Sequence, residues 1–270
     1  MTILITGAAG IVGAGLRREL AGDGEPLRLL DRQPITDLQG HETAMLGSIS
    51  DRAALVEAML GVRAVIHLAG CTTDAEIEDQ IEGNVRGAYN VFEAARLAGV
   101  ERVVFASSHH VVGYYPRRRR IGTDALLRPD SRYGLTKCFG EQVGAMFADK
   151  HGLRVLCIRI GYADDKPVDR RRLSIWCSWR DLAQLVRIGL RHEQLRYAVV
   201  YGTSGNTRAF FDNETAFRLG YKPQDDAEVH AAAVLADVPV EDPALVGSHV
   251  MGGWAANNEY TGPIDRVKEW

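Results

Sequence analysis

Residues 2–13 read Thr2-Ile3-Leu4-Ile5-Thr6-Gly7-Ala8-Ala9-Gly10-Ile11-Val12-Gly13, a short run rich in β-branched residues followed at once by a glycine-rich turn. The run predicts a strand, and residues 14–20 have the composition of a helix. Glycines in such a turn permit positive φ and let the backbone approach a pyrophosphate at the helix N-terminus. The spacing is Gly-x-x-Gly-x-x-Gly rather than the standard Gly-x-Gly-x-x-Gly, and glycine-rich turns also serve purely structural roles. The position between a strand and a helix favours a dinucleotide site.

The next strand-like run, residues 27–30, ends at Asp31, which lies 24 residues beyond Gly7. A carboxylate at this distance is placed to accept the ribose hydroxyls of the adenosine and to repel a 2'-phosphate, so it predicts NAD rather than NADP. The alternative is that Asp31 is a turn residue before Gln33-Pro34. Arg32 is expected to stack on the adenine or to lie in solvent.

Strand-like and helical runs then alternate as far as residue 160. The strand-like runs are residues 64–68, 102–106 and 154–160, and the helical runs are residues 81–98 and 133–150. This alternation predicts an α/β fold, a doubly wound parallel sheet of the Rossmann type with helices on both faces. We expect residues 1–270 to form a single domain, in which about 161–270 contribute a small C-terminal cap that binds the substrate.

Composition narrows the classes of function. The net charge of −3 over 270 residues argues against nucleic acids and membrane surfaces as partners. The chain has neither an apolar run of about 20 residues nor an N-terminal signal segment, so a cytoplasmic location is expected. The four cysteines follow no metal-binding or disulfide spacing, so no metal is expected; they are Cys71, Cys138, Cys157 and Cys177.

Tyr133 and Lys137 are four residues apart in a helical run, so both side chains lie on one face of the helix. A tyrosine with a pKa near ~10 is a poor base at neutral pH, but a nearby ammonium favours its charged form. Such a tyrosine can take a proton from a sugar hydroxyl. Ser108 precedes the pair by one loop.

These pieces together resemble the extended short-chain dehydrogenase/reductase family, over residues 1 to about 160. The matching segments, in family order, are Thr6-Gly7-x-x-Gly10-x-x-Gly13, His67-Leu68-Ala69-Gly70, Gly83-Asn84-Val85, Ser107-Ser108 and Tyr133-x-x-x-Lys137. The resemblance implies that Ser108 orients the substrate, that Tyr133 is the base, and that Lys137 activates it and contacts the ribose. It also implies that Asn84 supports the active site.

A closer similarity, to the uronate dehydrogenase family, covers nearly the whole chain. It is carried by residues 107–116, 128–141 and 159–161, and by Arg171, five residues before Trp176, where that family has the arginine that grips the sugar carboxylate. The similarity implies oxidation of the C1 hydroxyl of a free hexuronic acid, glucuronate or galacturonate, to an aldaro-lactone, with hydride transfer to NAD. Two segments depart from the pattern: His109 replaces an asparagine, and residues 161–165 replace a Gly-Ser-Cys type loop.

The predicted catalytic residues are therefore Ser108, Tyr133 and Lys137. The predicted cofactor-binding residues are Gly7, Ala9, Gly10, Ile11, Val12, Gly13, Asp31, Arg32, Ser50, Leu68, Ala69, Gly70, Asn84, Tyr133, Lys137, Ile160 and Tyr162. The predicted substrate-binding residues are Thr72, Ser108, His109, His110, Tyr133 and Arg171. His109 and His110 are equally compatible with local packing, and the run Arg170–Arg172 is also compatible with a solvated basic stretch.

Two other functions remain open. One is an NAD-dependent sugar epimerase or another sugar dehydrogenase of the same family. The other is an NAD-binding regulator without turnover, against which the intact Ser108, Tyr133 and Lys137 argue. Only about 110 residues follow Ile160, which favours a small free sugar over a nucleotide sugar. The run Arg117–Arg120 is expected to be a solvated loop, or else to attract an anionic substrate. A homo-oligomer is expected, as is common for such enzymes.

Overall fold

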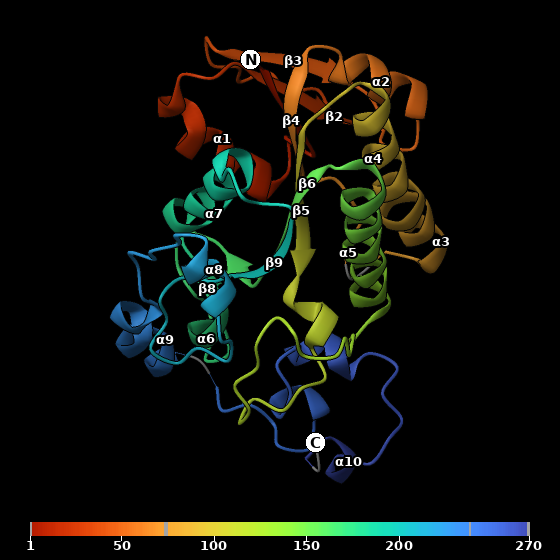
Figure 1. The fold of residues 1–270 in the computed structure, drawn as a ribbon. Coiled ribbons are helices and arrows are strands. Elements are labelled where there is room, and N and C mark those ends of the chain that lie inside the picture. Colours follow the sequence, from red (N-terminus) through yellow and green to blue (C-terminus); the bar gives the residue numbers. More distant parts are fainter. Residues whose placement is uncertain (1, 73–74, 238, 269–270) are drawn as a thin grey trace.

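The computed structural model describes residues 2–72, 75–237 and 239–268. Its centre is a seven-stranded sheet in which every neighbouring pair of strands is parallel (Figure 1). In spatial order the strands are β3 (Glu42–Leu46), β2 (Leu27–Asp31), β1 (Thr2–Thr6), β4 (Val62–His67), β5 (Arg102–Ser108), β6 (Arg154–Ile160) and β9 (Tyr197–Gly202). The strand order reverses between β1 and β4, where ligands bind in sheets of this kind. The predicted doubly wound α/β fold is confirmed.

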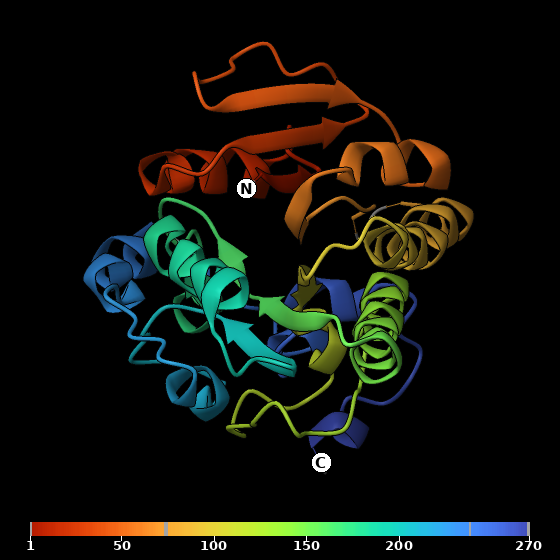
Figure 2. The ribbon, with the colours of Figure 1, turned by 45° about the horizontal axis from the view of Figure 1, so that its top comes forward.

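Helices cover both faces of this sheet (Figure 2). Side chains alternate along β1, so Ile3 and Ile5 enter one hydrophobic core and Leu4 enters the other. The first core is closed by α1 (Ile11–Leu20) and α7 (Trp179–Arg191), and the second by α2 (Arg52–Met59), α4 (Gly87–Leu97) and α5 (Arg132–His151). The sheet is therefore buried on both faces, as a parallel sheet requires.

The short elements lie mostly beyond the carboxyl ends of the strands, where Figure 1 shows the C-terminal segments in blue below β5. They are α3 (Ile77–Gln80), the π-helix η2 (Ile81–Arg86), β7 (Tyr162–Ala163), α6 (Arg172–Ile175), β8 (Trp176–Cys177), α8 (Glu214–Arg218), α9 (Ala231–Asp237) and α10 (Asp265–Lys268), with 3-10 helices η1 (Ala21–Asp23), η3 (His109–Val112), η4 (Ala227–His230), η5 (Val246–Ser248) and η6 (Gly253–Asn257).

The predicted elements agree in type with the structure and differ by a few residues at several bounds, and two of these differences bear on the site. Ser107 and Ser108 form the last two residues of β5 instead of following it, because both pair with β6. The helix expected at residues 81–98 begins earlier, at Ile77, and passes through the π-helix η2 before α4. The wider π turn places the buried Asn84 against the loop after β4.

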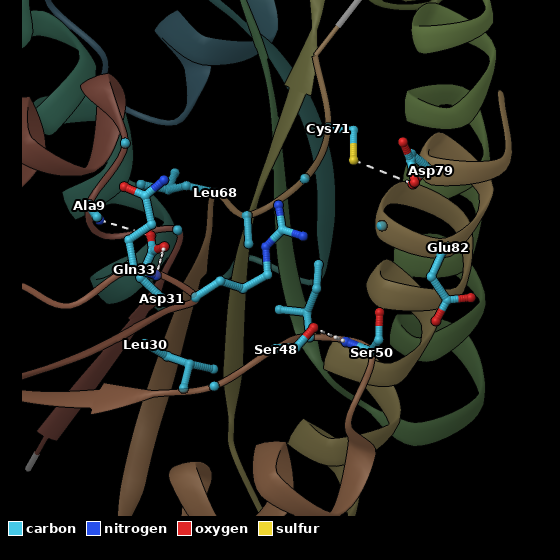
Figure 3. A pocket seen from close by; sticks show the side chains of 18 of the residues that line it. Ala9, Leu30, Asp31, Gln33, Ser48, Ser50, Leu68, Cys71, Asp79 and Glu82 are labelled. Atoms are coloured by element: carbon cyan, nitrogen blue, oxygen red, sulfur yellow. Dashed lines mark hydrogen bonds between the residues drawn. The ribbon is translucent and has the colours of Figure 1, made fainter. Parts of the chain in front are cut away.

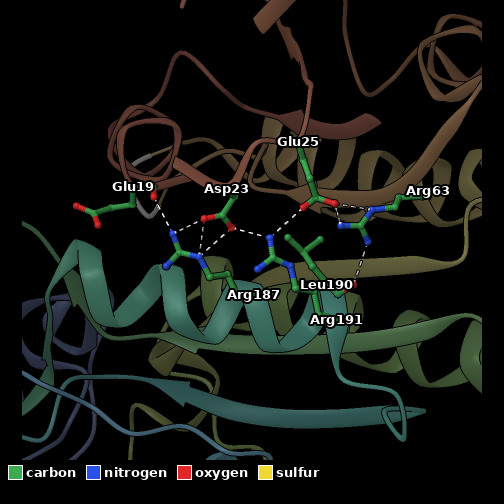
Figure 4. A network of polar contacts seen from close by, with 7 residues as sticks. All are labelled: Glu19, Asp23, Glu25, Arg63, Arg187, Leu190 and Arg191. Atoms are coloured by element: carbon green, nitrogen blue, oxygen red, sulfur yellow. Dashed lines mark hydrogen bonds and ion pairs between the residues drawn. The ribbon is translucent and has the colours of Figure 1, made fainter. Parts of the chain in front are cut away.

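A chain of ion pairs fixes α7 to the first half of the sheet (Figure 4). Arg187 and Arg191 both contact Asp23, and Arg191 continues to Glu25, which also binds Arg63. Single exposed ion pairs contribute little, but a connected set holds its members in one arrangement. None of the helices that the structure describes is long and apolar enough to span a bilayer.

Candidate active site

A cavity of about 600 Å³ opens where the carboxyl ends of β1, β2 and β4 meet (Figure 3). Nine of the residues predicted to bind the cofactor line it, namely Gly7, Ala9, Gly10, Asp31, Arg32, Ser50, Leu68, Ala69 and Gly70. Its volume lies within the range of small-molecule and cofactor sites, ~300 to 1,000 Å³. The sequence motifs thus converge on one crevice at the topological switch point.

The glycine-rich turn leaves room for a phosphate at the start of α1. Gly7 has φ +73°, and a Cβ added to it would lie 2.6 Å from the Ala69 amide nitrogen. Gly10 is the N-cap residue of α1 and has no side chain, so no N-cap side chain covers the amide groups of the first helical turn. Gly13 allows α1 to pack on this turn, since a Cβ there would lie 2.6 Å from Gly7 O. This arrangement fits the pyrophosphate of a dinucleotide.

Asp31 lies at the end of β2, on the wall of the cavity. Its Oδ2 accepts a hydrogen bond from the Ala9 amide at 2.9 Å, and its Oδ1 accepts one from the Gln33 amide at 3.0 Å. The carboxylate is therefore held beside the phosphate turn, one strand away from it. This is the place that a ribose-binding acid occupies in dinucleotide folds.

The cavity lining also contains residues that sequence reasoning missed. Gly47, Ser48 and Ile49 follow β3, which reads Glu-Thr-Ala-Met-Leu and carries too weak a strand pattern to be recognised. Asp79 and Glu82 reach the cavity from α3 and η2. Ser50, which the resemblance did indicate, lies among them, with its amide bonded to Ser48 Oγ.

The predicted catalytic residues meet beyond this cavity, at the end of β5. The side chain of Ser131 caps α5 by accepting a hydrogen bond from the Gly134 amide, which fixes the helix start beside Ser108. Tyr133 and Lys137 lie on one face of α5, with Lys137 Nζ 5.5 Å from the centre of the Tyr133 ring. Nζ donates to Ala106 O at 2.9 Å, so the ammonium is tied to β5.

Burial dominates the electrostatics of this pair. It raises the pKa of Tyr133 to about 12, although a hydrogen bond with Ser108 acts in the opposite direction. Burial also lowers the pKa of Lys137 to about 8. Lys137 is not among the groups that shift the pKa of Tyr133, and loss of solvent is the largest influence on this pKa. Perturbed groups of this kind, paired in a crevice, are typical of catalytic sites.

Asn84 supports the site through its side chain. It is buried, its Oδ1 accepts from the Cys71 amide at 2.7 Å, and its Nδ2 donates to Thr136 Oγ1 at 3.0 Å. These bonds tie the loop after β4 to α5, between Tyr133 and Lys137. A supporting role for Asn84 in the active site stays a prediction.

A buried arginine stands on the side of the site away from the dinucleotide cavity. Arg171, just before α6, is 6% exposed, and its Nη1 donates to Met251 O at 3.0 Å. The same Nη1 lies 3.2 Å from His109 Nε2. Burial lowers the pKa of Arg171 to about 10, although Asp169 and Asp130 act in the opposite direction, and no carboxylate that the structure describes forms a salt bridge with it. A cation buried in this way favours an anionic ligand.

The two histidines after Ser108 have different surroundings. The His110 amide donates to Ser108 Oγ at 3.2 Å, and the ring stands edge-on to Tyr133, so His110 borders the reacting groups. Its Nδ1 lies 2.7 Å from the fully buried carboxylate of Asp130, which sequence reasoning missed. Asp130 immediately precedes Ser131, and this closeness to the catalytic helix was its only signal.

Several predicted residues lie elsewhere. Ile11 is exposed at the start of α1, and Val12 packs on the core. Thr72 lines the dinucleotide cavity, whereas Ile160 and Tyr162 are absent from its described lining. The Tyr162 hydroxyl donates to Asp164, and Arg172 covers its ring. Among the residues that the structure describes, no cluster of three metal-binding side chains exists.

The Arg117–Arg120 run is less free than its composition suggested. Arg117 pairs with Glu241 and donates to Gly247 O and Val250 O, and the Arg119 guanidinium lies over the Tyr115 ring. The first of these arginines therefore fastens the C-terminal segment to the loop after η3 and serves a structural purpose.

Comparison with known proteins agrees with this geometry. Residues 3–162 match the model of the NAD dependent epimerase/dehydratase family. The chain is 41% identical to a uronate dehydrogenase from Pseudomonas putida, over 90% of this chain and 92% of that protein. It also resembles the structure of uronate dehydrogenase from Agrobacterium tumefaciens, with 37% identity, a TM-score of 0.91 and coverage of 97% of both chains. A variant of that enzyme complexed with NAD has 36% identity, a TM-score of 0.91 and coverage of 97% and 98%.

Both the family model and the near-complete coverage of these relatives agree with the seven-stranded parallel sheet described above. The chain therefore belongs to the NAD dependent epimerase/dehydratase family, and within it to the group of uronate dehydrogenase-like proteins.

Proposed function

We propose that this protein is an NAD-dependent uronate dehydrogenase that oxidises the C1 hydroxyl of a free hexuronic acid, glucuronate or galacturonate, to the aldaro-lactone. The observation that carries the proposal is Arg171, a buried guanidinium without a carboxylate partner among the described residues, on the same side of the fold as Ser108 and Tyr133. A sugar with a carboxylate would supply the missing negative charge.

The chain's own residues divide the chemistry among them. Tyr133 acts as the base in its phenolate form, which the Lys137 ammonium stabilises, and it becomes a neutral phenol when it takes the proton of the C1 hydroxyl. Ser108 Oγ accepts from the His110 amide and is hydrogen-bonded to Tyr133, so the Ser108 hydroxyl lies beside the base, where it can orient the reacting oxygen. When bound, NAD supplies the acceptor for the hydride that leaves C1. Asp31 and the glycine-rich turn hold the two ends of its adenosine diphosphate half.

Substrate size follows from the segment after β6. Of the elements after Ile160, β9 and α7 belong to the sheet and its cover. We infer that residues 1–270 act as one domain in which about 161–270 close the sugar site. The short elements of this segment suit a monosaccharide.

We further infer that the enzyme works in the cytoplasm as a homo-oligomer. Leu135, Phe139 and Met146 are exposed along α5, where a second copy of the chain would cover them. Closed symmetric pairs are the common solution for such surfaces.

An epimerase returns the hydride to its substrate and accumulates no NADH, and a regulator binds NAD without turnover. The purified protein, given NAD and a panel of uronic and neutral sugars, is expected to form NADH with uronates. Absence of NADH formation with every uronate contradicts the proposal and leaves these two alternatives.

Arg171 gives the sharper test of substrate class. Arg171→Ala is expected to lower kcat/KM for glucuronate and galacturonate by ~2 to 4 kcal/mol, since it removes one partner of a desolvated charge pair. Arg170→Ala is the matched control, because Arg170 is exposed and adjacent. A neutral aldose has no carboxylate to lose and is expected to be affected much less. Undiminished uronate oxidation by Arg171→Ala contradicts the assignment of Arg171.

A further inference from the structure

His109 is the first residue of η3 and follows the catalytic Ser108 directly. The sequence predicted it in the sugar site, but the structure leaves it only 3% exposed. Its Nδ1 lies 3.2 Å from Ile160 O and its Nε2 lies 3.2 Å from Arg171 Nη1. Both ring nitrogens are therefore engaged inside the protein, and neither remains to bind a sugar.

These two partners fix the protonation of the ring. A carbonyl oxygen only accepts, so Nδ1 must carry the proton that is shared with Ile160 O. A guanidinium only donates, so Nε2 must offer a lone pair to Arg171. Both requirements are met by one neutral tautomer and by no other form. Burial and the neighbouring charges of His110 and Arg171 lower the pKa of His109 well below its usual value, in agreement with that tautomer.

The contact between His109 and Arg171 determines which edge of the guanidinium is left for a ligand. Nη1 has two protons, and the two acceptors recorded for it are His109 Nε2 and Met251 O. Among the described residues, no acceptor is recorded for Nε or Nη2. These two nitrogens lie on one edge of the guanidinium and form the fork that binds a carboxylate in two-pronged fashion. His109 and Met251 thus hold one edge and leave the opposite edge for a ligand.

We propose that His109 is a specificity-determining positioning residue, a neutral acceptor that orients the Arg171 guanidinium so that its Nε and Nη2 edge meets the carboxylate of the substrate. The inference rests on the proposed function, since it concerns the same sugar site. In this proposal His109 acts by holding Arg171 and forms no direct hydrogen bond with a sugar hydroxyl.

The first test separates an effect through Arg171 from a direct contact. His109→Phe keeps a planar ring against His110 and removes both ring nitrogens. We expect KM for glucuronate to rise about tenfold or more, the scale of one hydrogen bond to a charged group, while kcat and NAD affinity change little. His109→Gln carries an amide oxygen to the place of Nε2 and is expected to restore KM nearly to the parent value.

A double-mutant cycle completes the test. In the Arg171→Ala background, His109→Phe is expected to cause no further loss of kcat/KM, because its effect passes through the arginine. A full additional loss in that background shows that His109 contacts the sugar itself and overturns the inference. An unchanged KM in the single variant overturns it as well. If His109→Phe does not fold, His109→Leu provides the same comparison.

A crystal structure of the His109→Phe variant gives a readout that does not depend on turnover. The Arg171 guanidinium is expected to leave its position at Met251 O, and a guanidinium still in place overturns the inference. Failure of the proposed function is recognised separately, because the parent protein then forms no NADH with any uronate.

Discussion

Tyr133 lies in surroundings that oppose the charge it must carry. Burial raises the pKa of its phenol to about 12, while the Ser108 hydroxyl acts in the opposite direction. Lys137 Nζ is held by Ala106 O, beside the ring and ready to stabilise a phenolate. Loss of solvent thus disfavours the phenolate, and Lys137 is the neighbour placed to stabilise it when Tyr133 acts as the base.

Removal of the phenolic oxygen tests this arrangement directly. Tyr133→Phe is expected to bind NAD normally and to lose turnover by roughly 10² or more, the scale of general acid-base catalysis. Stopped-flow measurement of NADH formation with saturating uronate checks it. Tyr89→Phe, on the exposed face of α4, is the control and is expected to leave turnover unchanged. Near-normal turnover in Tyr133→Phe would move the role of base to His110.

The central residues of the site could be predicted from the sequence because their signal is local. Tyr133 and Lys137 are one helical turn apart, and Gly7 and Asp31 each follow a strand. Met251 and Asp130 carried no such signal. Met251 contacts Arg171 although the two residues are 80 positions apart in the sequence. Asp130 matters to the site through its contact with His110, which forms only in the folded chain.

At the scale of elements, the turn before η6 packs directly on the site. A Cβ added to Gly252 would lie 1.8 Å from Asp130 Oδ2, and one added to Gly253 would lie 2.3 Å from Arg171 Nε. Gly253 also has φ +67°. The C-terminal segment therefore forms a wall of the proposed sugar site.

Gly253→Ala is expected to displace the Arg171 side chain and to lower kcat/KM for uronates about tenfold, the scale of one hydrogen bond to a charged group. Gly99→Ala is the matched control, because Gly99 has φ +73° and no atom within 4 Å of an added Cβ. Both variants carry the same backbone strain, so a fall in melting temperature is common to them. Equal activity of the two variants would show that Arg171 tolerates the intrusion.

A second element-level feature lies beneath the site. Arg159 of β6 and Glu141 of α5 form a buried two-pronged ion pair, and Ser107 of β5 donates to the same carboxylate at 2.6 Å. These bonds fix α5 against the two strands that carry Ser108 and Ile160. The sequence indicates Glu141 and Arg159 only as parts of segments that resemble a known family, since nothing in their spacing of 18 residues indicates a contact.

Over the whole molecule, the sequence predicted β1, β2, β4, β5 and β6 with the helices α1, α4 and α5, because alternating buried runs leave few arrangements of a parallel sheet, but it assigned no residues to α2, α7 or β9. The third strand was not recognised, since β3 is mostly exposed and lacks β-branched residues apart from Thr43. The π-helix η2 was also missed, because its form depends on the packing of Asn84 against the loop after β4.

His67, in the centre of this sheet, predicts how stability responds to acid. Burial lowers its pKa to about 3, and Thr6 Oγ1 lies 2.8 Å from its Nδ1. Between pH 6.5 and 3 the unfolded chain binds a proton at this position and the folded chain does not, so acid favours unfolding. We expect the contribution of neutral His67 to the free energy of unfolding to be complete above pH 6.5 and to be lost progressively as the pH falls toward 3.

Urea unfolding at several pH values measures this effect. The slope from His67 is at most about 1.4 kcal/mol per pH unit, which corresponds to one proton. His67→Leu is expected to reduce the slope, and the exposed His151→Leu is expected to keep it. Part of the slope remains in His67→Leu, because the pKa of His109 is lowered in the same direction. An unaltered slope in His67→Leu would locate the acid sensitivity in other groups.

The contacts that His109 and Met251 make with Arg171 restrict how substrate preference can change. Replacement of Arg171 alone strands two inward-facing acceptors, His109 Nε2 and Met251 O, each at a penalty of ~1 to 3 kcal/mol. A change of preference from acidic to neutral sugars by replacement of Arg171 alone therefore passes through a variant with a lower free energy of unfolding. Simultaneous replacement of residues 109 and 171 avoids this loss of stability. Libraries that vary the two positions as a pair should yield folded neutral-sugar variants more often than libraries that vary position 171 alone.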